Sequence, residues 1–347
     1  MKENKAPALV RLLRKELAEG NYPEGSRFPS ENDLANRFEI NKTTANRIVS
    51  VLVAEGLLKR GVRGSGTYVI KEEAFPKGQI AFIAPLGHYH VCSMLRGASD
   101  YALTRKYVVT PVMPSSQTLN RHLKLLRNSP FKGILTSSYE TVDAPDGIPV
   151  IHIDQDFPAN DRVHHAVNAD NYNGARELMC KAIAAGHREI AIFQSDITNI
   201  LGGKIISGYL DAMREGGIPH PEKRIFQCVE WSQLSFNITL EQILHSYPNV
   251  TLIATESDND VMKFRTAFHL VAPEKQDGIV LTGFGNVAEF VRHFEFPTID
   301  MHFVRLGAIA AEKLISIMEN GEPEEPVREY QPCELINTSA LLCRRIV

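Results

Sequence analysis

Two clusters of polar residues near the amino terminus have the chemistry for contacting a nucleic acid. The first combines amide, hydroxyl and cationic side chains along one short segment: Asn41, Lys42, Thr43, Thr44, Asn46 and Arg47. The second surrounds a glycine-rich turn: Arg63, Gly64 and Ser65. Cationic groups pair with phosphates, and amides and hydroxyls bind base edges or backbone oxygens. With Arg27 and Ser30 upstream, we expect these residues to contact DNA.

Three helices are predicted to position the first cluster. Residues 8–19 form an amphipathic helix, because Leu9, Leu12, Leu13 and Leu17 recur at helical spacing. Ser30 with Asp33 three places later is a capping box for a second helix. Asn41 is the N-cap of a third, with an apolar stripe of Ala45, Ile48, Val49, Leu52 and Val53. The polar residues then face outward at the end of the helix that reads a major groove.

A two-stranded wing is predicted to follow these helices. The apolar runs 57–58 and 67–70 flank a basic, glycine-rich tip that contains Arg63, Gly64 and Ser65. Three helices and a wing make residues 1–70 a winged helix-turn-helix domain. Charge agrees with this, since residues 1–70 carry 12 lysines and arginines against 8 acidic residues, whereas residues 71–347 carry 26 against 33. A basic head on an acidic body attracts the phosphates of DNA to the head.

The head also resembles a known family in its residues. Phe28-Pro29-Ser30-Glu31, Leu34-Ala35, Thr43-Thr44, Glu55-Gly56-Leu57-Leu58 and Gly64-Ser65-Gly66-Thr67-Tyr68-Val69 are similar to the DNA-binding head of the GntR family of bacterial transcription regulators. The resemblance implies that the head binds double-stranded, palindromic operator DNA. Lys42 and Asn46 stand where the family often has arginines, so no operator sequence carries over.

The chain beyond residue 78 alternates strands with helices. Residues 71–78 are polar and end in proline and glycine, which predicts a linker. Near-continuous apolar strands then alternate with helices, among them a first strand over 79–85 and a helix over 93–106. This pattern predicts an α/β fold with doubly wound parallel sheets in two lobes. Ligands of such sheets bind at the carboxyl ends of the strands.

The body resembles the LacI/GalR effector domain, a fold shared with periplasmic sugar-binding proteins. The residues that carry the resemblance are Val167-Asn168-Ala169-Asp170-Asn171, Gly174-Ala175, Ala185-Gly186-His187-Arg188-Glu189-Ile190-Ala191, Gly208-Tyr209, Gly283-Phe284, Leu306-Gly307-Ala308 and Glu334-Leu335-Ile336. The resemblance implies an effector-binding and dimerisation domain over 79–347. We expect a first lobe at about 79–168 and 294–325, and a second at about 169–293 and 326–347. A GntR-type head on this body is an architecture of the arabinose-repressor type.

The resemblance also implies which residues bind an effector. Carboxylates and amides bind sugar hydroxyls, and an aromatic ring covers the apolar face of the sugar. Asp154, Asp258 and Trp231 match such positions, and His88, Tyr89, Ser137 and Lys204 are further candidates. Each of the first three has a structural alternative: Asp154 bonds loop amides, Asp258 caps a helix, and Trp231 fills a core.

Two departures put the sugar specificity of relatives in doubt. Ile205, beside Lys204, replaces an arginine that clamps sugar hydroxyls, and Gly285-Asn286 replaces a pair of aspartates. A second hypothesis therefore stays open, in which the body is a dimerisation module without a sugar ligand or responds to a non-sugar ligand.

Several other classes are disfavoured. The amino terminus is charged and no apolar stretch reaches the ~18 residues of a membrane span, so we expect a cytoplasmic protein. His88-x-His90 and His164-His165 lack a third metal ligand, and the cysteines are scattered singly. No nucleophile elbow or phosphate loop is present. We expect no catalytic residue, metal or cofactor.

These observations predict a ligand-responsive transcription regulator, a repressor of carbohydrate-utilisation genes, that is a homodimer and not an enzyme. By resemblance, the dimer surface comprises the helices at 93–106 and 304–320.

Overall fold

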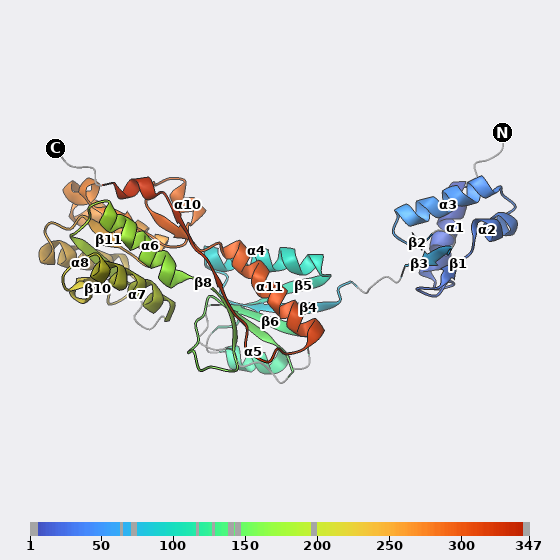
Figure 1. The fold of residues 1–347 in the computed structure, drawn as a ribbon, viewed down its shortest axis with the longest axis horizontal. Helices are drawn as coiled ribbons and strands as arrows, with labels where there is room; N and C mark the ends of the chain where they lie inside the picture. The colour runs from blue at the N-terminus through green and yellow to red at the C-terminus, as the bar shows by residue number, and fades with distance from the viewer. Residues whose placement is uncertain are drawn as a thin grey trace. The chain divides into compact units, whose positions relative to one another are not determined.

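The computed structural model describes residues 6–62, 65–70, 75–115, 118–126, 129–137, 142, 147–195 and 200–342. The chain divides into two compact units, Met1–Lys77 and Gly78–Val347, called the head and the body below (Figure 1). The division falls within the predicted linker 71–78.

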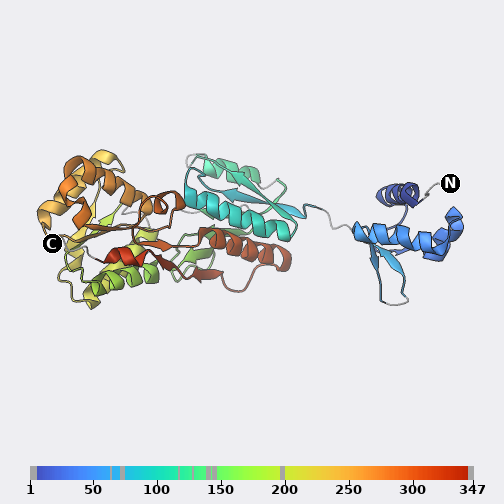
Figure 2. The ribbon, with the colours of Figure 1, turned by 90° about the horizontal axis from the view of Figure 1, so that it is seen from above.

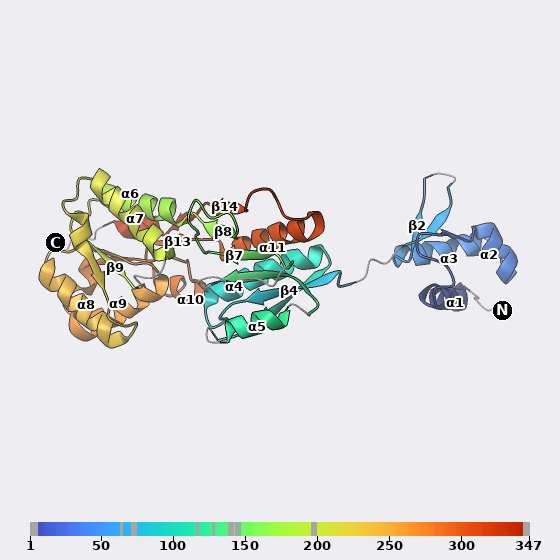
Figure 3. The same cartoon turned by 90° about the horizontal axis from the view of Figure 1, so that it is seen from below.

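The head is a winged helix-turn-helix domain. Its helices are α1 (Ala6–Ala18), α2 (Glu31–Phe38) and α3 (Lys42–Ala54). Its antiparallel sheet has the order β1-β3-β2, with β1 (Arg27–Phe28), β3 (Thr67–Val69) and β2 (Leu58–Arg60), and β2 and β3 project beside α3 (Figure 3). The predicted stripe of α3 is buried except for Val53, which is partly buried. The stripe of α1 differs, because Val10 and Leu13 are buried whereas Leu12 is 41% exposed.

The first lobe of the body is built on a six-stranded parallel sheet. Its order is β14-β8-β7-β6-β4-β5, with β4 (Gly78–Ile83), β5 (Tyr107–Val112), β6 (Phe131–Ser137), β7 (Val150–Ile153), β8 (His165–Ala169) and β14 (Arg328–Gln331). Successive side chains of a strand point to opposite faces. Ile80 and Phe82 therefore pack with α4 (Tyr89–Thr104) and α11 (Phe303–Asn320), while Ala81 and Ile83 pack with α5 (Leu119–Leu126).

The second lobe repeats this arrangement on a smaller scale. Its four parallel strands, in the order β10-β9-β11-β12, are β10 (Ile225–Gln227), β9 (Ile190–Gln194), β11 (Leu252–Ala254) and β12 (Val280–Thr282). Ile190 and Ile192 face α6 (Asn171–Ala184) and α7 (Ile200–Glu215). Ala191 and Phe193 face α8 (Gln233–Ser246) and α9 (Asp258–Val271). A short helix, α10 (Ala288–Val291), follows β12. The predicted doubly wound α/β fold class is confirmed.

The carboxyl-terminal part of the chain corrects two predicted boundaries, since Thr298–Asp300, expected in the first lobe, also lies against the second. Residues 326–347 were expected in the second lobe, but β14 pairs in parallel with β8 at the edge of the first lobe's sheet. After β14, β15 (Glu334–Ile336) pairs antiparallel with β13 (Thr298–Asp300) next to α6. The chain thus crosses between the lobes at 169–171, at 300–303 and at 331–334.

Helix α4 begins four residues earlier than the predicted start at 93. Val91 and Met94 continue the buried stripe formed by Ala98 and Ala102, so the helical pattern extends back through the expected loop. Tyr89 and His90 consequently lie in the first turn of α4, and His88 takes the N-cap position.

Helices α4 and α11 lie side by side in close contact (Figure 2). A Cβ atom on Gly97 of α4 would overlap the Val304 carbonyl oxygen, and one on Gly307 of α11 would overlap the Met94 carbonyl oxygen. Only glycine allows two backbones to approach this closely.

We expect Gly97→Ala to lower the free energy of unfolding of the body by about 1–3 kcal/mol, since the added methyl group overpacks a rigid backbone contact. Urea denaturation followed by circular dichroism measures the change. Gly87→Ala is the matched control, because nothing lies within 4 Å of a Cβ at Gly87. Equal stability of the two variants would contradict the close-contact argument.

Candidate functional sites

The first turn of α3 is fixed by a cap and by the core beneath it. Asn41 Oδ1 accepts a hydrogen bond from the Thr44 backbone N–H at 2.7 Å. Buried apolar residues hold the opposite face of the helix: Ala45, Ile48, Val49 and Leu52. Four of the predicted DNA-contacting side chains are thereby left exposed at one end of α3: Lys42, Thr43, Asn46 and Arg47. This surface can present cations and hydrogen-bonding groups to an anionic polymer.

Ser30 has a role in starting α2. Its hydroxyl accepts from the Asp33 backbone N–H at 3.2 Å and donates to Asp33 Oδ2 at 2.7 Å, while its own N–H donates to the same oxygen at 2.9 Å. These bonds with Ser30 lower the pKa of Asp33. Both predicted caps, at Ser30 and at Asn41, form as expected, so both side chains serve the fold of the head.

A chain of polar contacts joins α2, α3 and the wing. Asn46 Nδ2 lies 3.5 Å from Glu31 Oε1, and Ser50 Oγ lies 3.4 Å from Asn46 Oδ1. Arg60 Nη2 of β2 donates to Ser50 Oγ at 2.9 Å. Sequence reasoning missed Ser50 and Arg60. The available signal was that Ser50 lies one helical turn beyond Asn46, on the same face.

In the described part of the wing, Arg27 lies beside the turn. Ser65 Oγ donates to the Val62 carbonyl oxygen at 2.7 Å and so stabilises the turn itself. Gly66 has a φ of +101°, and a Cβ there would lie 2.6 Å from Arg27 Nε. Glycine therefore lets the exposed Arg27 lie against the wing. Arg63 and Gly64, also predicted to contact DNA, lie outside the described residues.

In the body, Asp154 lies where the sequence predicts a ligand-binding carboxylate. It follows β7 with a φ of +55°, and Asn171 Nδ2 lies 3.4 Å from its Oδ1. Burial, with a contribution from Asp156, raises the pKa of Asp154 to about 7. A carboxyl group at this position can bind ligand hydroxyls.

Trp231 is at the end of the second lobe's strands, as predicted. The indole Nε1–H donates to Asp260 Oδ1 at 3.1 Å, and Lys263 Nζ lies 5.0 Å from the ring centroid. The side chain is 55% exposed. Trp231 is therefore not a core residue, and its ring is held in one orientation by the buried Asp260.

Asp258, which the sequence predicts as a ligand contact, is turned to partners inside the second lobe in this structure. Asp258 is fully buried, and its two carboxylate oxygens accept hydrogen bonds from the Val287 N–H at 2.6 Å and the Thr298 hydroxyl at 2.5 Å. Burial raises its pKa to about 6. The helix cap is Ser257, and Asp258 connects α9 to the segment that follows β12 and to the first residue of β13.

The remaining candidates in the first lobe differ in access. Tyr89 is 41% exposed, and the exposed His88 stacks on His90 at 5.4 Å. Ser137 is 2% exposed and directs its hydroxyl to Met94 Sδ at 3.6 Å, so its role as a ligand contact stays a prediction. Its neighbour at position 138 lies outside the described residues.

Two polar residues at the strand ends of the second lobe were missed. Ser195, after β9, donates through its N–H to Glu256 Oε2 at 2.7 Å, and Glu256 follows β11. Their position directly after neighbouring parallel strands was the available signal. They lie at the same end of the sheet as Trp231.

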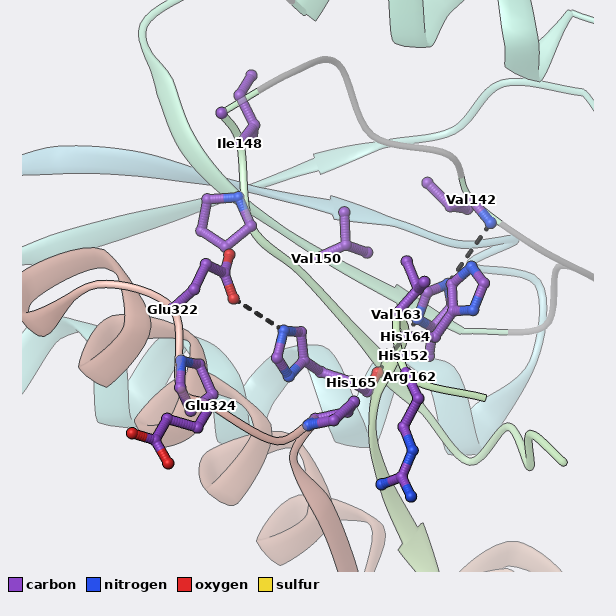
Figure 4. Close-up of a pocket in the computed structure, with 14 residues that line it drawn as sticks. Val142, Ile148, Val150, His152, Arg162, Val163, His164, His165, Glu322 and Glu324 are labelled. Carbon is purple, nitrogen blue, oxygen red and sulfur yellow. Dashed lines mark hydrogen bonds and ion pairs between the residues drawn. The ribbon is translucent and has the colours of Figure 1, made fainter. Parts of the chain in front are cut away.

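One cavity of the first lobe lies away from these residues. It has a volume of about 520 Å³ and lies at the amino ends of β7 and β8, where His165 Nε2 lies 3.0 Å from Glu322 Oε2 and Val142 N–H lies 3.5 Å from His152 Nε2 (Figure 4). A second cavity of about 360 Å³ includes Lys204, alone among the predicted effector residues. Lys204 is exposed near the start of α7.

The described ranges contain no side-chain cluster for a metal ion and no helix that could span a membrane. Among these residues, no group of three His, Cys, Asp or Glu side chains is arranged to hold a metal ion. No helix of the described chain has the length and apolar character needed to cross a membrane.

Two family models match the chain. Residues 5–69 match the bacterial regulatory proteins of the gntR family, and residues 96–338 match the periplasmic binding proteins and sugar binding domain of the LacI family. The transcriptional regulator CelR in complex with cellobiose has the same fold, with a TM-score of 0.67 and 15% identity over 89% of this chain and 98% of that one.

Curated relatives match either the whole chain or part of it. The arabinose metabolism transcriptional repressor of Halalkalibacterium halodurans is 23% identical over 91% of this chain and 90% of its own length. The histidine utilization repressor of Pseudomonas putida is 35% identical over 107 residues, which are 27% of this chain and 41% of that protein. The chain therefore spans less than half of the second relative.

The raised pKa of Asp154 predicts a pH dependence of stability. Because the folded protein holds this proton more tightly than the unfolded chain, the contribution favours folding at low pH and is lost as the pH rises through about 7. The free energy of unfolding of the wild type should fall between pH 5 and 8. In Asp154→Asn we expect this fall to be smaller by roughly 1–3 kcal/mol. Urea denaturation at both pH values measures it, with the exposed Asp100→Asn as control. If the unfolding free energy of Asp154→Asn falls between pH 5 and 8 as much as that of the wild type, the raised pKa of Asp154 is refuted.

Proposed function

The chain belongs to the family of periplasmic binding proteins and LacI-type sugar-binding domains, joined to a GntR-type DNA-binding head, and from this premise we propose that it is a cytoplasmic repressor of carbohydrate-utilisation genes. In this proposal the head binds a palindromic operator, and a small effector in the interlobe crevice controls that binding. The proposal assigns no catalytic step to the body.

The observation that carries the proposal is the exposed start of α3. A capped helix with Lys42, Thr43, Asn46 and Arg47 on one outward surface suits major-groove recognition, in which the first turns of a helix contact base edges. The alignment with the arabinose repressor supports the same role, since it runs through both the head and the body.

Dimerisation through α4 and α11 would bring two heads to one operator. Leu103 and Val304 are exposed apolar residues on these helices, at 51% and 37%. Two recognition helices on a palindrome must lie about 34 Å apart, one turn of duplex, to enter successive major grooves. A change in the geometry of the dimer would then break this spacing.

The effector would act by binding one arrangement of the lobes better than another. Asp154 lies at the strand ends of the first lobe and Trp231 at those of the second, so a ligand that contacts both favours their approach. Such coupling between two sites is typically about 1–3 kcal/mol.

We expect Lys42→Ala and Arg47→Ala each to weaken operator binding roughly tenfold and to reduce the salt dependence of binding by about one counterion, since each removes one phosphate contact. Fluorescence anisotropy with operator DNA at several salt concentrations measures both quantities. Lys181→Ala, on the exposed surface of α6, is the control. Unchanged affinity in both head variants would remove α3 from the interface.

We expect Trp231→Ala to abolish the thermal stabilisation of the full chain by a binding carbohydrate, since the ring and its orientation are lost together. Differential scanning fluorimetry against mono- and disaccharides, sugar acids and nucleosides measures the effect. Leu234→Ala, at a neighbouring residue that is 66% exposed, is the control. If no compound stabilises the wild type, the body is better explained as a dimerisation module without a small ligand.

A further inference from the structure

The 360 Å³ cavity is lined by residues of both lobes. The first lobe contributes Phe157, Asp161 and Arg162 from the loop between β7 and β8, and Arg328 and Tyr330 from β14. The second lobe contributes Lys204 from α7. Ligand pockets start at about 300 Å³, so this space suits a small molecule rather than a single ion or water.

The cavity has an excess of positive charge. Lys204, Arg162 and Arg328 face two acidic side chains, Asp161 and Glu325. Asp161 is already saturated, since it accepts from the N–H groups of Val163 and His164 at 2.9 Å, from His164 Nδ1 at 2.7 Å and from Arg328 Nη2 at 3.2 Å. These bonds hold the pKa of Asp161 well below its usual range. Asp161 therefore orients Arg328 and stays ionised.

Arg328 is fixed in position, whereas the other arginine is not. The Arg328 guanidinium lies 5.4 Å from the Phe157 ring centroid and its side chain is only 24% exposed. The Arg162–Glu325 pair is 70% and 71% exposed, so it contributes little stability and can exchange partners.

Lys204 supplies a cation from the opposite lobe. Its side chain is exposed and has no ion pair with any residue in the part of the chain that the structure describes. Ile205, at the position where relatives have a clamping arginine, is 5% exposed and packs in the core. Lys204 is thus the residue of this turn that can meet a ligand.

The aromatic walls add a surface for a sugar ring. Tyr330 is 48% exposed, and its hydroxyl donates to Asp156 Oδ1 at 2.9 Å. Phe157 forms a second apolar wall. Cations, one phenolic hydroxyl and two rings suit a small hydroxylated anion.

We propose that the effector carries a carboxylate or phosphate group, which Lys204 of the second lobe and Arg328 of the first lobe bind together. This inference rests on the proposed function, because it assigns a chemical class to an effector of the same sensor. The anionic group binds in this cavity, whose lining does not include Asp154 or Trp231. An anion shared between the two lobes stabilises their approach directly. A neutral sugar carries no charge with which these two cations could pair.

Matched pairs of compounds test the charge of the ligand. Isothermal titration calorimetry on the full chain compares D-galacturonate with D-galactose, and D-gluconate and D-glucose 6-phosphate with D-glucose, at low and high salt. We expect at least one anion to bind while its neutral parent does not, with affinity that falls as salt rises. Whether the carboxylates or the phosphate ester binds identifies the anionic group.

Variants of Lys204 test whether this residue binds the anion. Lys204→Met should weaken binding of that anion at least about tenfold, which is ~1.4 kcal/mol, while Lys204→Arg keeps the charge and should stay within about threefold. Lys181→Met on the exposed surface of α6 is the matched control. Full affinity in Lys204→Met would overturn the assignment even if an anion binds.

The outcomes separate this inference from the function on which it rests. Binding of neutral sugars but of none of the anions overturns the anionic class and leaves a sugar-responsive repressor standing. Binding of neither class overturns the anionic effector and also counts against ligand control of the body. Operator binding by the head is measured independently of both.

Discussion

The parallel pairing of β14 with β8 determines most of the body's geometry. The Ala166 N–H donates to the Val327 carbonyl at 2.8 Å and the Asp170 N–H donates to the Gln331 carbonyl at 2.7 Å, so the chain returns from the second lobe to the edge of the first. This ladder directs Arg328 and Tyr330 toward the loop after β7, and it fixes the crossings on either side of Asp170 and Gln331. Without it, neither the wall of the smaller cavity nor the closely spaced interlobe crossings would form.

Three aspartates of the body show how surroundings give one side chain different roles. Asp258 has donors on both oxygens and holds the segments around β12 and β13 together. Asp260 orients Trp231, while burial raises its pKa to about 6. Asp154, at the end of β7, has the Asn171 amide 3.4 Å from its Oδ1. Burial of a carboxyl group costs free energy that hydrogen bonds must offset, and in all three cases burial raises the pKa of the carboxyl group.

Local patterns predicted the head and the alternation of the body well, since caps and apolar stripes depend on residues close in sequence. Ser30, Asn41 and the stripe of α3 illustrate this. The pairing of β14 could not be predicted in this way, because it joins residues about 160 positions apart. The same limit applies to the burial of Asp258 and Ser137. Their places in the sequence predict positions near a crevice, but tertiary contacts with Thr298 and Met94 bury both side chains. Leu12 was misassigned because its helix has more apolar residues than one stripe needs.

The glycine contact between α4 and α11 has a consequence for movement. A backbone carbonyl of each helix occupies the place of the other's missing side chain, so neither helix can slide or turn without separating from its partner. The two helices therefore move together as one rigid strut. At one end His90 of α4 contacts Phe303 of α11, with ring centroids 5.5 Å apart. At the other end α4 leads into β5, whose first residue, Tyr107, pairs with Gly78, where the body begins. The 16 residues of α4 span about 24 Å, so a displacement at the first end reaches the start of the body undiminished.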